Sequence, residues 1–129
     1  MAEEKTLSSR LSLTLQVMNS NELESGRAAK CQFSADGGDI GHASSCHWPV
    51  QDRAGAVAGR ACQIVLHDGA FCLRSLMPGV MINLAPVGTD TGLVRLRQGD
   101  EISIGALALK AFLHEGRRTS YDEQMAAPD

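Results

Sequence analysis

Residues 61–74 read ACQIVLHDGAFCLR. Apolar side chains at Cys62, Ile64 and Leu66 recur at every second position, which is the period of a half-buried strand. A second apolar run, Phe71-Cys72-Leu73, follows the pair Asp68-Gly69. Asp-Gly between two such runs is the strongest short-range hairpin signal, because both turn residues adopt positive φ. This stretch therefore predicts an antiparallel β-hairpin.

Short strands are also predicted on both sides of this hairpin. Residues 11–18 alternate, with leucine or valine at each odd position from Leu11 to Val17. Nothing in the chain has the period of a long amphipathic helix. Eight or more short strands separated by turn residues predict an all-β protein, an antiparallel β-sandwich. The other predicted strands are 30–33, 40–42, 46–50, 80–84, 94–96, 102–104 and 107–112, with a loop at 86–92.

The composition suits one small domain without a charged ligand surface. The chain has 129 residues and a formal net charge of -3, which gives no electrostatic reason to expect nucleic acid or an anionic membrane. No apolar run is long enough to span a bilayer, and Glu3 and Glu4 have the wrong sign for a signal peptide. A cytoplasmic protein is expected. The domain is predicted at 11–113, between flexible tails at 1–10 and 114–129.

The cysteines and histidines do not form a recognisable metal or catalytic motif. Cysteine has no C-x-x-C pair, so reduced thiols are expected, with Cys31 and Cys62 inside. Cys46 and His47 are neighbours on a predicted strand, where adjacent side chains point to opposite faces, so they cannot easily pair as nucleophile and base. Trp48 is expected to be a core residue. No metal site, cofactor or enzymatic activity is predicted. The histidines, expected to be exposed, are His42, His47, His67 and His114.

Five motifs between residues 38 and 105 resemble the forkhead-associated (FHA) family. The second resembles the Cys-Asp-Trp run of FHA domains in bacterial type VI secretion accessory proteins. With the first strand included, the resemblance covers roughly residues 11–113. It implies an eleven-stranded sandwich that binds phosphothreonine peptides through loops at one end. The motifs are Gly38 to His42, Ser45 to Asp52, Val57 to Ile64, Asp68 to Leu73, and Arg97 to Gly105.

The resemblance also implies that the phosphate-binding side chains are missing. Family members use an arginine, a serine and an asparagine, which make charge-assisted hydrogen bonds to the phosphate or fix the peptide. A hydrogen bond to a charged group contributes about 1.5–3 kcal/mol. Because a micromolar complex totals only about 8 kcal/mol, losing three such groups predicts loss of ordinary phosphothreonine binding. The degenerate positions are His42 for the arginine, Ala58 for the serine, Gly59 and Ala61 for the following arginine and histidine, Leu76 for a second serine, and Pro78 for the asparagine before the retained Gly79.

Two of the matching loops are apolar where relatives are polar. Val57, Leu76 and Met77 are therefore a candidate partner surface, since exposed apolar patches mark interaction sites. The alternative is that these side chains pack inward beneath the loops. Residual phosphopeptide binding through Arg60 or a protonated His42 stays open.

The function expected from these features is a protein-interaction module, independent of phosphorylation, in type VI secretion assembly or its regulation. A phosphothreonine-reading signalling domain is the first alternative, with a protein partner in either case. A structural domain that positions a C-terminal partner domain is the second. Membrane insertion and nucleic-acid binding are not expected.

Overall fold

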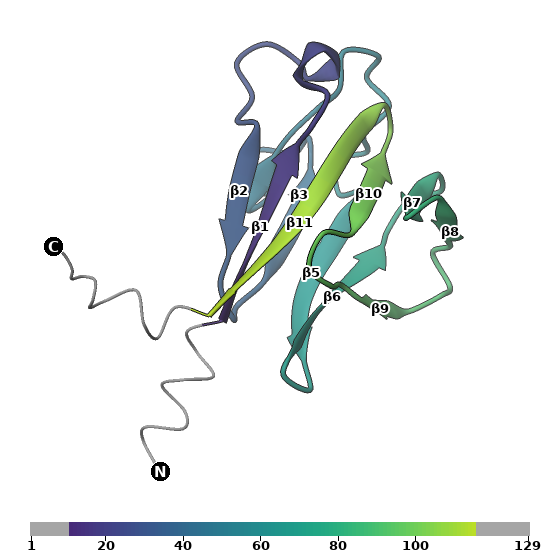
Figure 1. Ribbon diagram of the computed structural model, residues 1–129. Coiled ribbons are helices and arrows are strands. Elements are labelled where there is room, and N and C mark those ends of the chain that lie inside the picture. The colour runs from purple at the N-terminus through teal and green to yellow at the C-terminus, as the bar shows by residue number, and fades with distance from the viewer. Residues whose placement is uncertain (1–10, 116–129) are drawn as a thin grey trace, which may run out of the picture.

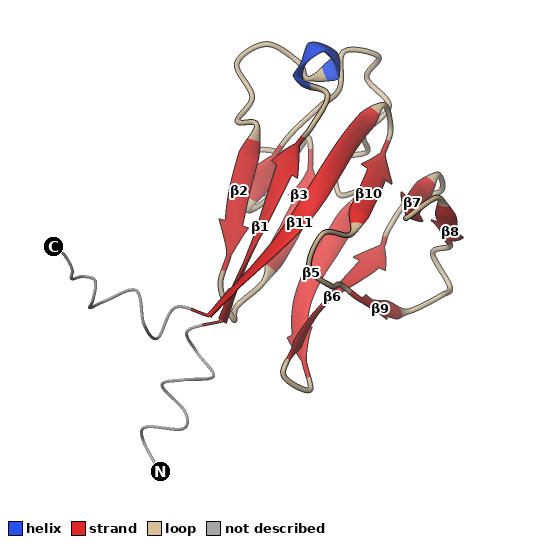
Figure 2. Ribbon diagram, in the orientation of Figure 1, coloured by secondary structure: helices blue, strands red, loops and turns tan. Residues whose placement is uncertain are grey.

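The computed structural model describes residues 11–115, so the predicted tail 1–10 and residues 116–129 of the predicted tail 114–129 lie outside the described residues. Eleven strands form two sheets that face each other as a sandwich (Figures 1 and 2). The six-stranded sheet has the order β2-β1-β11-β10-β7-β8, and the five-stranded sheet the order β4-β3-β5-β6-β9. The predicted all-β sandwich is confirmed. The strands are β1 (Leu11–Val17), β2 (Lys30–Phe33), β3 (Gly38–Gly41), β4 (Trp48–Pro49), β5 (Cys62–His67), β6 (Ala70–Ser75), β7 (Val80–Ile82), β8 (Ala85–Val87), β9 (Leu93–Arg95), β10 (Glu101–Ile104) and β11 (Leu107–Glu115).

The central hairpin is the one that the sequence predicts. β5 pairs antiparallel with β6, from Cys62 opposite Ser75 to His67 opposite Ala70. Asp68 and Gly69 at the turn have φ values of 52° and 76°, as a two-residue hairpin of this type requires. On the inner face of the sheet, Ile64 and Leu73 are buried.

The core lies between the sheets and is built from alternate residues of the strands. In β1, Leu13, Leu15 and Val17 are buried, as their alternation predicts. Trp48 is also buried, and its indole nitrogen donates to the Ala28 carbonyl oxygen at 3.1 Å. Burying side chains from both sheets stabilises the sandwich, because each buried aliphatic side chain contributes about 1.5–3 kcal/mol.

Several predicted strand boundaries differ from the structure. The predicted strand 80–84 and loop 86–92 are wrong in part, because the chain turns at Asn83 and Leu84 and returns as β8. The predicted strand 46–50 is reduced to Trp48–Pro49. β11 reaches Glu115, which lies opposite Leu11, so this strand is three residues longer than the predicted strand 107–112.

The four cysteines are free thiols. Cys62 is buried as predicted, whereas Cys31 is only half-buried, because β2 is an edge strand of its sheet. Burial raises the pKa of the Cys62 thiol to about 12.

The four histidines are exposed, in agreement with the prediction.

The described chain ends lie at the end of the sandwich that carries the β5–β6 turn (Figure 1). Leu11 and Leu113 line a small recess there together with Gly69. The loops that follow β3 and β6 are at the opposite end. Among residues 11–115, no helix has the length and hydropathy needed to cross a membrane.

Candidate functional site

Three loops meet at the end of the sandwich opposite the described chain ends. They are residues 42–47 after β3, 50–61 before β5, and 76–79 after β6. The His42 amide donates to the Ala58 carbonyl oxygen at 3.1 Å, and the Leu76 amide donates to the Ala61 carbonyl oxygen at 2.8 Å. The Ala58 amide also contacts the Met77 sulfur at 3.4 Å. The structure thus brings the predicted site positions of all three loops together.

Two glycines meet different backbone requirements of these loops: Gly41 lets the first two loops lie close together, and Gly79 adopts a positive φ in the third. A Cβ atom on Gly41 would be 2.2 Å from the Gly59 carbonyl oxygen, so no larger residue fits there without moving the backbone. Gly79, which the resemblance marks as retained, has a φ of 91°. Glycine adopts that conformation without the cost that a Cβ atom imposes.

His42, which the resemblance aligns with the family's arginine, has its ring bonded to the neighbouring loop. Its Nδ1 lies 2.8 Å from the Val57 carbonyl oxygen. Since a carbonyl oxygen only accepts, Nδ1 carries the proton, and Nε2 is the nitrogen available for another contact. A Cβ atom on Gly59 would lie 3.9 Å from this ring. The His42 ring therefore lies next to Gly59.

Both arginines of the loop 50–61 are held by residues outside it. The Arg60 Nε donates to an Asp39 carboxylate oxygen at 3.1 Å, and the Arg53 Nε donates to the Asn21 carbonyl oxygen at 2.7 Å. The Arg60 side chain is 56% exposed and the Asp39 side chain 29% exposed. The ion pair therefore partly neutralises the cation nearest to the predicted site positions Ala58 and Gly59.

The candidate apolar surface is only partly accessible. Val57 is 1% exposed and belongs to the core, so its assignment to a partner surface is wrong. Its loop is drawn inward because Gln51 bonds both the amide and the carbonyl oxygen of Val57. Leu76 and Met77 are half-buried, and Pro78 and Gly79 are exposed. Met77 also packs against the core, so Leu76 and Pro78 are the more accessible members.

Asp52 anchors these loops, although its motif position gave no sign of that role. Its carboxylate is buried, with 1% of the residue exposed. One oxygen accepts from the Ala56 amide at 2.7 Å, and the other accepts from the Ala106 amide at 2.8 Å. A single side chain therefore ties the loop before β5 to the turn between β10 and β11. Gly105 leaves room for the Asp52 carboxylate, because a Cβ atom at this position would lie only 2.8 Å from a carboxylate oxygen.

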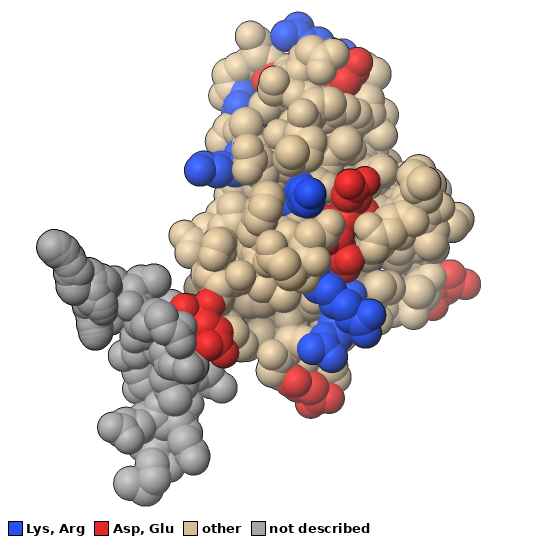
Figure 3. Space-filling view, in the orientation of Figure 1, with Lys and Arg blue, Asp and Glu red and all other residues tan. Residues whose placement is uncertain are grey.

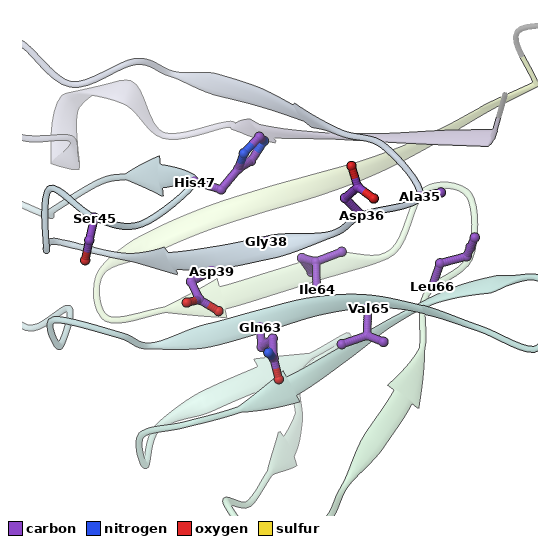
Figure 4. A pocket seen from close by; sticks show the side chains of 10 residues that line it. All are labelled: Ala35, Asp36, Gly38, Asp39, Ser45, His47, Gln63, Ile64, Val65 and Leu66. Carbon is purple, nitrogen blue, oxygen red and sulfur yellow. The ribbon is translucent and has the colours of Figure 1, made fainter. Parts of the chain in front are cut away.

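A wide recess runs along β3 and β5 beside the loop end (Figure 4). Its lining includes Asp36, Asp39, His47 and Gln63, but their polar ends do not converge on one point in this view. Asp39 is paired with Arg60, and His47 Nε2 lies 2.9 Å from the Gln32 carbonyl oxygen. Because Asp39 and His47 already bond to other residues of the protein, the recess is a weaker candidate for a binding site than the loops.

A comparison with protein-family models decides the family. The FHA domain model matches residues 38–105, which is 68 of 129 residues and covers all three loops. The chain belongs to the FHA family. This family consists of protein-interaction modules, and the resemblance identified from the motifs is confirmed at that level.

Solved FHA domains share this architecture. One comes from a structural and functional analysis of phosphothreonine-dependent FHA domain interactions; it is 25% identical, with a TM-score of 0.62 over 80% of this chain and 97% of its own. The FhaA FHA domain, solved in complex with the intracellular domain of Rv3910, is 25% identical and has a TM-score of 0.60; the match covers 77% of this chain and 98% of that domain. The N-terminal FHA domain of S. cerevisiae Rad53p, solved with a phosphothreonine peptide, is 20% identical and has a TM-score of 0.63. The match covers 79% of this chain and 93% of that domain, and at this identity it supports the shared fold only. No curated protein matches the chain.

Proposed function

We propose that this FHA domain binds a partner protein through its loop end and does not require phosphothreonine. The observation that carries the proposal is that the side-chain donors beside the degenerate positions are already engaged within the protein. Arg60 is paired with Asp39, and the Nδ1–H of His42 is donated to the Val57 carbonyl oxygen. Phosphate binding needs several donors that point at one place, and Ala58, Gly59 and Pro78 have no side-chain donor.

The surface that replaces the phosphate site is apolar. We define the loop-end surface as Leu76, Met77 and Pro78, which lie next to Ala58. Loops held by a rigid sandwich are common binding sites, and methionine adapts to varied partners. The two buried anchors of this end, Asp52 and the Ser75 hydroxyl, which donates to the Met77 carbonyl oxygen at 2.6 Å, keep the surface ordered before a partner arrives.

Calorimetry with matched peptides tests whether phosphorylation matters. A library of phosphothreonine peptides should bind no better than the same peptides without phosphate. Micromolar binding that disappears on dephosphorylation would overturn the proposal.

Phosphothreonine recognition is the second candidate function, and the exposure of Arg60 favours it. An exposed ion pair contributes only about 0.2–1 kcal/mol, so a phosphate could displace Asp39 from Arg60. In that case Arg60→Ala should abolish phosphopeptide binding, whereas Arg53→Ala, in the same loop, should leave it unchanged.

Paired substitutions test the loop-end surface. Leu76→Asp should abolish partner binding, because it puts a charge into a desolvated contact. Leu113→Asp is the matched control, since Leu113 is 37% exposed at the opposite end of the sandwich. Both variants should keep the melting temperature of the unchanged protein within a few degrees, which separates lost binding from lost folding. A partner that still binds the Leu76→Asp variant would rule this surface out.

We place this interaction in type VI secretion assembly or its regulation, on the Cys46-His47-Trp48 run and its resemblance to accessory proteins of that system. Within this proposal the protein is a cytoplasmic scaffold. A pull-down from the native bacterial cell, with and without phosphatase, should recover secretion components under both conditions. Recovery of kinase substrates in the untreated sample alone would favour the signalling alternative.

A further inference from the structure

A second apolar feature begins where the loop-end surface stops. A groove of about 650 Å³ lies between the start of β7 and the segment that follows β8. Val80 and Val87 are buried, with 1% and 5% exposure, and form its base. Pro78, Met81 and Pro86 line it at the more accessible positions. The volume and lining of the groove therefore suit an aliphatic side chain.

One charge stands in this groove. Asp90 lines it and is exposed. Within residues 11–115, no hydrogen bond or ion pair engages the Asp90 side chain, and no lysine or arginine lines the groove. Figure 3 shows the β7–β8 region as a largely uncharged lobe with acidic atoms on two sides, and the largest cluster of basic atoms lies below it, toward β9. An aliphatic wall next to an unpaired carboxylate complements a lysine or arginine, which combines an apolar stem with a cationic head.

The groove is continuous with the loop-end surface, because Pro78 belongs to both. A partner segment that contacts Leu76 can therefore reach Asp90 without leaving the protein. Addition of the segment as a new strand at the sheet edge is disfavoured, since β8 is the edge strand and Pro86, in its middle, has no amide hydrogen to donate. Recognition at this place relies on side chains.

We infer that the groove takes the lysine or arginine side chain of an unphosphorylated partner segment, whose neighbouring residues contact the loop-end surface. This inference rests on the proposed function and names the chemistry of its partner. The stem packs against Met81 and Pro86, and the cationic head pairs with Asp90.

Selection from a random peptide display library, with the full chain as bait, tests the inference without knowledge of the partner. Peptides selected on the unchanged protein should be enriched in lysine or arginine at one position. A selected peptide should bind the Asp90→Asn variant about two- to five-fold more weakly, as expected for an exposed ion pair. Selection on Asp90→Lys should instead enrich aspartate or glutamate. Asp68→Asn, which removes an exposed carboxylate at the opposite end, is the matched control and should change nothing.

The outcomes separate this inference from the proposed function. Peptides that require Leu76 but show no basic preference, and bind equally to Asp90→Asn, would overturn the groove assignment and leave the loop-end surface in place. Peptides that are indifferent to Leu76→Asp would contradict both. A dimer in light scattering that Met81→Lys dissociates would also overturn the inference, because a second copy would then fill the groove.

Discussion

Leu84 is the most unusual single residue of this sandwich. It is 81% exposed and has a φ of 69° in the turn between β7 and β8. A residue with a Cβ atom is strained in this left-handed conformation, and two-residue hairpin turns of this kind favour glycine. The preceding Asn83 holds the turn in place, since its side chain bonds Asp100 at 3.0 Å and accepts from the Glu101 amide at 2.9 Å. The strain at Leu84 is thus imposed by the residues around it.

We predict that Leu84→Gly stabilises the protein by about 0.5–1 kcal/mol. Relief of the strained conformation exceeds the extra freedom that glycine gives to the unfolded chain. Urea denaturation followed by tryptophan fluorescence measures the change. Leu113→Gly is the control and should destabilise, because Leu113 lies within β11 and not in a left-handed turn. A lower stability of Leu84→Gly would contradict the assigned turn.

Cys62 should make stability depend on alkaline pH. Burial raises the pKa of its thiol from 9.0 to about 12, so the unfolded chain loses this proton first. The stabilisation is complete below pH 9 and is lost as pH rises toward 12, with a slope of up to about 1.4 kcal/mol per pH unit. Denaturation of Cys62→Ala along the same pH series should lack this slope.

Thiol titration at neutral pH should find half-buried Cys31 reacting before Cys62, and the reverse order would contradict their burial.

At the scale of elements, the site depends on how the loop before β5 is attached to the sheets. Asp52 bonds the amides of Ala56 and Ala106, and Gln51 bonds Val57. These contacts turn a loop of small residues into a fixed one. They explain why Val57 enters the core although its sequence neighbours are polar or small.

Asp52→Ala should therefore destabilise the protein by about 2–4 kcal/mol, because two buried amides lose their acceptor. Asp52→Asn keeps one carbonyl oxygen and should lose about half as much. Amide hydrogen exchange gives the local readout: Ala56 and Ala106 should lose protection in Asp52→Ala, while the amides of β1 keep theirs. Unchanged exchange at Ala56 would show that the loop is held by other contacts.

At the scale of the whole molecule, binding loops and chain ends are at opposite ends of one sandwich. β1 pairs with β11 over the whole of β1, from Leu11 opposite Glu115 to Val17 opposite Leu109. The domain boundaries proposed from this pairing are residues 11 and 115. A segment attached at either boundary leaves the loop-end surface free, which suits a module that connects a partner to the rest of a protein.

A fragment of residues 11–115 should consequently keep the stability of the full chain to within about 1 kcal/mol, which corresponds to about 4–8 °C in melting temperature for a domain of this size. A fragment of 11–113 is the matched comparison and should melt lower, because it loses the partners of Leu11 and Ser12. Differential scanning calorimetry of both fragments decides this. Equal melting temperatures of the two fragments would place the boundary at 113 instead.

The sequence by itself determined most of the strands and the family. Alternation in residues 11–17 and 61–67 and the pair Asp68-Gly69 act within a few residues, so their structure follows from local periodicity and turn chemistry. The motifs of residues 38–105 likewise identified the FHA family. They did not predict β8, because Asn83-Leu84 lacks the glycine that marks such turns.

Only the tertiary structure decided which loop side chains are accessible. Val57, Leu76 and Met77 have the same apolar character in the sequence, yet Val57 is in the core. The difference arises from hydrogen bonds between distant residues, such as Asp52 with Ala106, and from the pairing of Arg60 with Asp39. Burial of a loop residue depends on which segments pack over it, and that is a property of long-range contacts that no local pattern contains.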